Sequence, residues 1–420
     1  MIKKYRRGCC NTKPFQKNRS KMKSKKILGF ERNVFTAGLV SFFMDVSSEM
    51  IYPLVPLFLA NTLGINKSVI GLIEGIAESA ASLLKGFFGW ASDKLGKRKP
   101  FMTIGYGIST LSRPIVALAF SWQHVLGARI VDRFGKGMRT APRDAIIAES
   151  VDQAHSARAF GFHRAMDTMG AVVGPLLAFI FLSLFANNYR KVFWLSMVPG
   201  IIAVVLIILF ITEKGRESKG LHRSRLTFKH FDWKFRYFIF ITTLFALGNS
   251  SDAFLILRAQ NLGMAVKTIP LVYLLFNLVY SISSYPAGVV ADKFGKKRVM
   301  LSGFILFALV YSGFASCKTA GFIWPLFAFY GLFMGLTEGI QRGFLATIIP
   351  ADFKATAFGI YNMAIGITMF PASLIGGWLW DNVSPSATFY FGAITAGLSS
   401  ILFILFMFRC RNESEPKTAD

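Results

Sequence analysis

The chain consists mainly of long apolar stretches separated by short polar segments, and this pattern constrains its fold more than any other feature. About 20 apolar residues in an α-helix span the hydrocarbon core of a bilayer. Such stretches recur at 34–60, 68–91, 101–121, 124–147, 159–185, 192–212, 236–259, 268–291, 299–316, 322–348, 358–380 and 388–408. The pattern predicts an all-α polytopic membrane protein with 12 transmembrane helices.

The composition excludes two other classes of protein. Of the 420 residues, 53% are hydrophobic and 17% are charged, whereas a soluble protein has about 25% charged residues. Four cysteines in so long a chain exclude a secreted disulfide scaffold. The hydrophobicity excludes a solvated disordered chain.

The net charge of +26 is concentrated in short segments between apolar stretches. Basic residues gather in the N-terminal tail, at 94–99, at 214–236 and at 293–298. Lys and Arg mark cytoplasmic loops of membrane proteins, and 12 spans place both termini on one side. We therefore expect a plasma-membrane protein with cytoplasmic termini and a basic tail attracted to anionic lipid. An RNA-binding tail is the weaker alternative, so nucleic acid is not an expected partner.

An internal repeat divides the chain into two pseudo-symmetric six-helix halves. The sequence 89-GWASDKLGKRK-99 recurs as 288-GVVADKFGKKR-298, which separates Asp93 and Asp292 by 199 residues. The repeat also requires the charge-rich stretch 124–147 to count as a span. The expected division is a basic tail at 1–33, helical bundles at 34–212 and 236–408, a cytoplasmic linker at 213–235 and a tail at 409–420.

The repeated motif resembles the signature of the major facilitator superfamily, and the resemblance covers about residues 34–408. It implies two six-helix halves with a solute site between them, and a gate at the cytoplasmic loops. The gate residues implied by the motif, together with the ion pair expected at the end of the fourth span, are Gly89, Asp93, Gly96, Arg143, Asp144, Gly288, Asp292 and Gly295.

The fifth span contains 170-GAVVGP-175, which is similar to the antiporter signature of the same family. The similarity implies that Gly170, Gly174 and Pro175 serve helix packing, and it favours export. The match is partial, because Ala178 and Phe179 stand where later glycines are expected. In the fourth span, Arg133 stands where the family pattern has a glycine.

Cationic residues share one face of the fourth span. Arg129, Arg133 and Lys136 follow a helical spacing, and each would cost about 2.5–3.5 kcal/mol if it faced lipid. They therefore need acids from other helices or an anionic ligand. The residues expected to line the solute cavity are Arg129, Arg133, Lys136, Asn249, Asp252 and Asn277.

Acids on the first two spans are candidates for proton coupling. Asp45 and Glu49 lie one helical turn apart, and Glu78 lies on the second span. Carboxylates that share a low-dielectric site resist ionising together, which suits reversible protonation. The alternative is that all three are static partners of the cations on the fourth span.

The expected function is secondary active transport of a small anionic or zwitterionic organic solute by alternating access. We expect coupling to protons, export, and a monomer without cofactor or metal. The chain lacks a phosphate-binding loop and an H-E-x-x-H site, which argues against an enzyme and against an ATP-driven pump. The alternatives are a proton-coupled importer of an anionic metabolite or siderophore-like chelate, a channel, or a nutrient sensor on a transporter fold.

Overall fold

The computed structural model describes residues 26–27, 30–95, 97–151, 156–213, 232–349 and 354–412. This part of the chain is almost entirely helical. Strands β1 (Lys26–Ile27) and β2 (Phe30–Glu31) form a small antiparallel hairpin before the first helix. Most of the basic tail, the linker and the last residues lie outside the described ranges.

The first bundle contains six spans. In chain order its helices are α1 (Arg32–Ile51), α2 (Val55–Asn61), α3 (Lys67–Leu95), α4 (Lys99–Ala117), α5 (Trp122–Ser150), α6 (Ser156–Leu184) and α7 (Tyr189–Phe210). Helices α1 and α2 form one span that is interrupted around Pro53, because proline cannot donate the backbone hydrogen bond that a continuous helix needs.

The second bundle also contains six spans. Its helices are α8 (Trp233–Gly248), α9 (Ala253–Asn261), η3 (Val266–Thr268), α10 (Ile269–Phe294), α11 (Lys296–Ser316), η4 (Ala320–Phe322), α12 (Ile323–Leu345), α13 (Lys354–Asn382) and α14 (Pro385–Asn412). Helices α8 and α9 form one span, interrupted at 249–252. The 199-residue offset aligns Pro53 in the first interruption with Asp252 in the second. The prediction of an all-α fold with 12 spans is confirmed.

Three of these spans are less apolar than the others. Within the described ranges, nine spans are long and apolar enough to cross a membrane by length and composition, and α3, α4 and α5 fall outside that set. The same three helices hold most of the buried charged residues of the described chain, namely Glu74, Arg113, Arg129, Asp132, Arg133 and Arg139. Low hydropathy in these helices therefore reflects charge placed inside the bundle.

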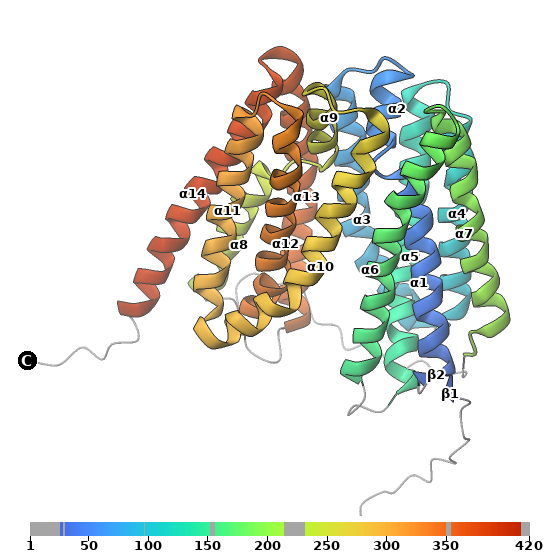
Figure 1. The fold of residues 1–420 in the computed structure, drawn as a ribbon. Coiled ribbons are helices and arrows are strands. Elements are labelled where there is room, and N and C mark those ends of the chain that lie inside the picture. The colour runs from blue at the N-terminus through green and yellow to red at the C-terminus, as the bar shows by residue number, and fades with distance from the viewer. Residues whose placement is uncertain are drawn as a thin grey trace, which may run out of the picture.

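The two bundles are packed closely at the end opposite the start of α1 and the end of α14, which we call the upper end (Figure 1). Asp381 at the end of α13 accepts hydrogen bonds from Ser68 N and Oγ (2.7 and 2.6 Å) and from Lys67 N (3.2 Å) at the start of α3. Gln260 donates to Asn61 at 2.8 Å. Toward the lower end the helices of the two bundles diverge (Figure 1).

Candidate transport site

Two ion pairs link α5 to α3 in the middle of the first bundle. Arg129 pairs with Glu74, and Arg133 pairs with Glu78. The partners are four residues apart on each helix, so both pairs lie on the same helix faces, one turn apart. Glu74 and Arg129 are only 1% and 4% exposed. Two of the three cations expected to line the cavity are thus already neutralised by acids from a neighbouring helix.

A third buried cation, Arg113 on α4, extends this network. Its Nη2 lies 3.3 Å from Asp132 Oδ1, and Asp132 Oδ2 lies 3.8 Å from Arg133 Nη1. Asp132 lies on α5 between the cations of that helix, yet its nearest cationic partner is the buried guanidinium of Arg113 from α4. Sequence reasoning missed Arg113, although a lone arginine before Pro114 in an apolar span was a usable signal.

Lys136 differs from these arginines. Among the residues that the structure describes, no acidic oxygen lies within ion-pair distance of its ammonium. Its side chain is exposed although it lies midway along α5. The charges that act on it include Asp45 from α1 and Glu78 from α3. Lys136 therefore lies among charged groups of the neighbouring helices α1 and α3.

The two acids of α1 lie beside this lysine and directly against α6. Asp45 and Glu49 are partly buried, and Lys136 acts electrostatically on both. Glu49 Oε2 is buried without a hydrogen-bond partner in the described part of the chain. A Cβ at Gly170 would lie 2.8 Å from Asp45 Cβ, and one at Gly174 would lie 2.7 Å from Glu49 Cβ. The two glycines therefore let α6 approach α1 at these acids; Pro175 follows within α6.

The second bundle presents polar groups from the interruption between α8 and α9. Asp252 accepts a hydrogen bond from Tyr330 OH at 2.7 Å, and Asn249 Oδ1 lies 3.4 Å from the same hydroxyl. Asn277 on α10 crosses to the first bundle, where it donates to the carbonyl of Ala171 at 3.4 Å. These three expected cavity residues thus lie on the second bundle, and Asn277 lies at its contact with the first.

Tyrosines occupy the junction between the bundles near these groups. The rings of Tyr52 and Tyr273 come from different bundles and have centroids 5.4 Å apart. Tyr52 also lies under the guanidinium of Arg129 at 5.5 Å. The sequence pattern gave no indication of this aromatic contact.

Among the described residues expected at the gate, Arg143 and Asp144 lie in the first bundle and Asp292 lies in the second. Arg143 pairs with the adjacent Asp144 at 2.9 Å and donates to Ser41 at 3.2 Å, both within the first bundle. In the second bundle, Asp292 lies 3.9 Å from Lys296. Gly295 joins α10 to α11 with a φ of 97°, a conformation that favours glycine. Gly288 lies in α10 and Gly89 and Asp93 in α3; the surroundings of Gly89 and Asp93, and all of Gly96, lie outside the described residues.

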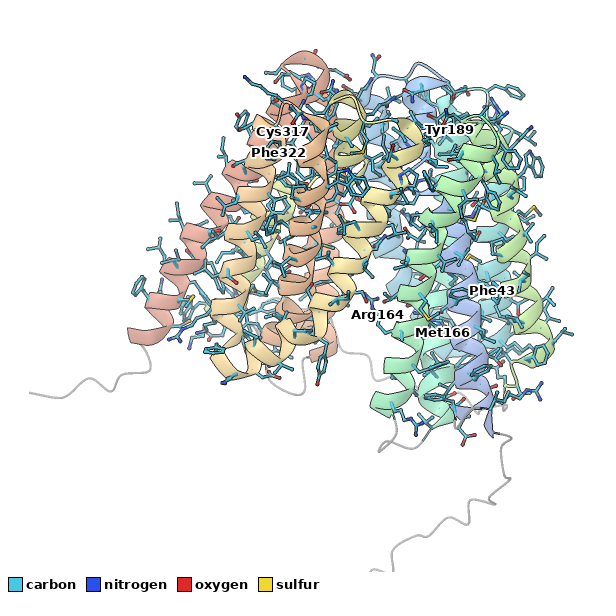
Figure 2. All side chains as sticks on the ribbon, in the orientation of Figure 1. Phe43, Arg164, Met166, Tyr189, Cys317 and Phe322 are labelled. Atoms are coloured by element: carbon cyan, nitrogen blue, oxygen red, sulfur yellow. The ribbon has the colours of Figure 1, made fainter. Side chains whose placement is uncertain are left out.

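Arg164 on α6 points from the first bundle toward the second (Figure 2). Its Nη2 donates to Tyr280 OH on α10 at 2.9 Å. Its neighbour on the same helix, His163, is buried and is hydrogen-bonded to Ser41 at 2.7 Å. Arg164 therefore connects the bundles, whereas His163 is enclosed in the first one.

Comparison with known proteins agrees with this architecture. The family model of the Major Facilitator Superfamily matches residues 37–257 and 236–419. An uncharacterized MFS-type transporter of Methanocaldococcus jannaschii is 36% identical over 379 residues, which cover 89% of this chain and 94% of the relative. A homolog of the multi-drug resistance efflux pump PmrA from Lactococcus lactis is 23% identical and covers 84% of this chain and 90% of its own.

A solved structure has the same fold at low sequence identity. A POT family transporter in complex with 5-aminolevulinic acid superposes with a TM-score of 0.78 at 10% identity, covering 93% of this chain and 99% of that one. Together with the family model and the 36% identical relative, this confirms the resemblance inferred from the repeated motif. The chain belongs to the major facilitator superfamily and is a multi-pass membrane transporter rather than an enzyme.

Proposed function

We propose that this protein exports a small zwitterionic organic solute by alternating access, in exchange for protons. The observation that carries the proposal is the exposed, unpaired Lys136 among charged groups of α1 and α3. Arg129 and Arg133 have acidic partners on α3, so an anionic group on the solute is not needed to neutralise them. Lys136 is the cation of this group that lacks such a partner within the described chain, and we assign it to the solute carboxylate.

The opposite end of the solute faces the second bundle. Asp252 lies at the helix interruption with only a tyrosine hydroxyl as its hydrogen-bond partner among the described residues, and it suits an ammonium group. Asn249 and Asn277 add neutral hydrogen-bonding groups on the same bundle. A solute held by Lys136 on one side and Asp252 on the other contacts both bundles, which alternating access requires.

Asp45 and Glu49 are assigned to proton coupling. Their carboxylates lie in the field of Lys136 and make no ion pair within the described ranges. Glu49 also lies in the field of Asp252, so an ammonium group held at Asp252 favours the ionised form of Glu49 and competes with its proton. Binding of a zwitterion then releases the proton, and the two move in opposite directions. Glu78, paired with Arg133, sits at the edge of this group and links it to the buried network.

The same geometry favours a second candidate, which is proton-coupled uptake of an anion. An anion bound to Lys136 neutralises the positive charge that stabilises ionised Asp45 and Glu49, and so it favours their protonation. Solute and proton then bind together, which is symport. The charge on the solute therefore decides the direction of coupling, with an ammonium group giving exchange and a bare anion giving symport.

Untargeted metabolite profiling of cells and medium tests the proposal. Cells that express the wild type, Lys136→Ala or Lys136→Arg at equal membrane levels are compared, with Lys267→Ala in η3 as the control. A solute that gathers in the medium with the wild type and the control but not with Lys136→Ala supports export. Accumulation inside the cells supports uptake, and identical profiles for the wild type and Lys136→Ala contradict a role for Lys136 in either direction.

A further inference from the structure

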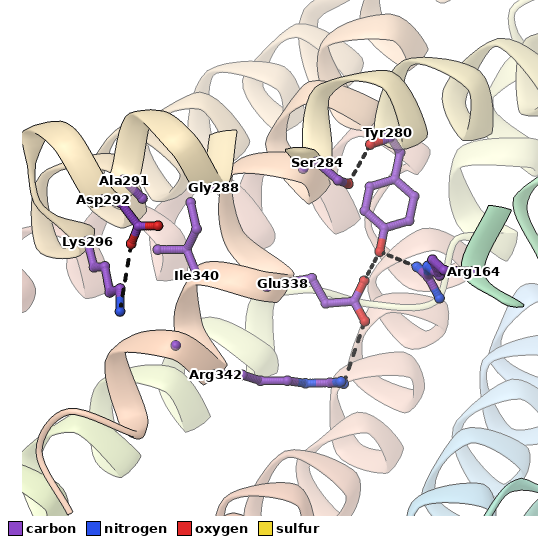
Figure 3. A pocket seen from close by; sticks show the side chains of 13 residues that line it. Arg164, Tyr280, Ser284, Gly288, Ala291, Asp292, Lys296, Glu338, Ile340 and Arg342 are labelled. Atoms are coloured by element: carbon purple, nitrogen blue, oxygen red, sulfur yellow. Dashed lines mark hydrogen bonds and ion pairs between the residues drawn. The ribbon is translucent and has the colours of Figure 1, made fainter. Parts of the chain in front are cut away.

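A cavity of about 540 Å³ lies against the second bundle, and neither Lys136 nor Asp252 is among the residues that line it. Figure 3 shows its lining side chains. Its walls come from α10, α12 and the adjoining start of α11, and Arg164 of the first bundle completes it. The volume is in the range of about 300–1,000 Å³ that small-molecule sites occupy. A cavity of this size with charged walls is suited to hold a small polar molecule.

Glycines create the space. A Cβ added at Gly288 of α10 or at Gly339 of α12 would meet no atom within 4 Å. By contrast, a Cβ at Gly335, one turn before Gly339, would lie 2.2 Å from Ser283 Oγ. Gly335 therefore permits close packing of the two helices, whereas Gly288 and Gly339 leave room that packing does not require.

The charged groups that line the cavity are loosely paired. Arg342 lies 3.5 Å from Glu338 and Lys296 lies 3.9 Å from Asp292, both beyond the usual hydrogen-bond range of about 2.7–3.2 Å. The side chain of Arg342 is 59% exposed. These cations therefore keep hydrogen-bonding capacity for a further partner.

Hydrogen bonds in the wall of the cavity join the two bundles. Tyr280 OH donates to Glu338 and accepts from Arg164 Nη2 (Figure 3). The lining therefore contains three cations and two acids. The cations are Arg164, Lys296 and Arg342, and the acids are Asp292 and Glu338. The surplus of positive charge favours an anionic group, and arginine offers a planar pair of donors that matches a carboxylate.

We propose that this α10–α12 cavity is a separate binding site for the carboxylate end of a small organic solute. Arg342 holds the carboxylate, Lys296 adds to the positive charge of the lining, and Arg164 makes occupancy depend on the position of the first bundle. The identification of this solute with the transported one rests on the proposed function. Binding in the cavity itself does not, because it requires no residue of the Lys136 group.

Protection from thiol labelling tests the site. Ser284, which lines the cavity, is replaced by cysteine in a chain whose Cys9, Cys10, Cys317 and Cys410 are serine. The labelling rate with a methanethiosulfonate reagent is measured in the presence of butyrate, 4-aminobutyrate or butylamine. We expect both carboxylates to slow labelling, by about tenfold at ten times the Kd, and butylamine to have no effect.

Cavity-filling variants supply the matched comparison. Gly339→Val and Arg342→Gln should each remove the protection, whereas Gly397→Val should retain it, since a Cβ at Gly397 on α14 also meets no atom within 4 Å but lies away from the cavity. Protection by butylamine equal to that by butyrate would overturn the carboxylate assignment. Protection that survives in Gly339→Val would overturn the site.

A further variant separates this proposal from the proposed function. Lys136→Ala should keep the protection by carboxylates, because Lys136 does not line this cavity. If metabolite profiles do not depend on Lys136 while protection is observed, the cavity stands and the proposed transport site fails. If Lys136→Ala removes both protection and transport, the two sites are one and the inference of a separate site is wrong.

Discussion

The buried pair of Glu74 and Arg129 gives the sharpest test of which charges serve structure. In Glu74→Gln the amide keeps the shape of the side chain but loses the charge that compensates Arg129. The two side chains are only 2% and 5% exposed, and Arg129 Nε already lacks a hydrogen-bond partner in the described chain. Breaking a buried ion pair by removing one partner costs about 3–5 kcal/mol, and we expect a loss of that size.

Removal of both charges should restore most of this stability. In the double variant Glu74→Gln with Arg129→Met no unpaired charge remains, and replacing a buried pair by neutral groups is often close to neutral. The free energy of unfolding, measured by denaturant titration in detergent micelles for the wild type, both single variants and the double variant, gives the coupling energy. We expect Glu78→Gln to cost less than Glu74→Gln, because Glu78 is 29% exposed and water reaches it.

A change in stability of less than about 1 kcal/mol in Glu74→Gln, or a double variant as unstable as the single ones, would refute a structural role for this ion pair. A stable Glu74→Gln protein that cannot transport would mean that this pair belongs to the transport cycle. The roles assigned to Arg129 and Lys136 would then have to be exchanged.

Three further substitutions test other parts of the account. Asp381→Ala removes three hydrogen bonds between α13 and the start of α3. A loss of about 1.4 kcal/mol or more should raise the population of the conformation that is open at the upper end about tenfold. Spin labels on α2 and α9 should then lie farther apart, and unchanged distances would contradict this role of Asp381. Gly174→Val places a Cβ 2.7 Å from Glu49 Cβ and should lower the free energy of unfolding by about 1–3 kcal/mol. In the control Gly161→Val the added Cβ meets no atom within 4 Å, and we expect no such loss. Asp252→Asn should raise the KM for a zwitterionic solute while leaving uptake of a simple anion unchanged, and an equal effect on both would remove the ammonium site.

The sequence predicted the spans well because bilayer thickness fixes the length of an apolar stretch independently of tertiary contacts. The expected stretches at 34–60 and 236–259 each became one span, although each is interrupted. The interruption at Pro53 could be anticipated from proline chemistry, whereas the one before Ala253 contains no proline. The internal repeat was the signal that connects the two.

The partners of the charged residues were harder to predict, because the sequence does not say which helices are neighbours. Glu74 was visible as an acid on the second span, but its pairing with Arg129 depends on the packing of α3 against α5. The role of Arg113 depends in the same way on the packing of α4 against α5, which brings it to Asp132. The α10–α12 cavity is made by glycines and by a side chain from α6, so no single segment of sequence contains its signal.

Simultaneous measurement of solute and proton fluxes in proteoliposomes tests the central claim most directly. The solute found by metabolite profiling is applied to liposomes that contain a pH-sensitive dye, with the wild type or Glu49→Gln. We predict that in the wild type protons move opposite to the solute, and that Glu49→Gln moves solute with little proton flux. Solute flux without proton movement in the wild type, or coupling unchanged in Glu49→Gln, would contradict proton exchange through the acids of α1.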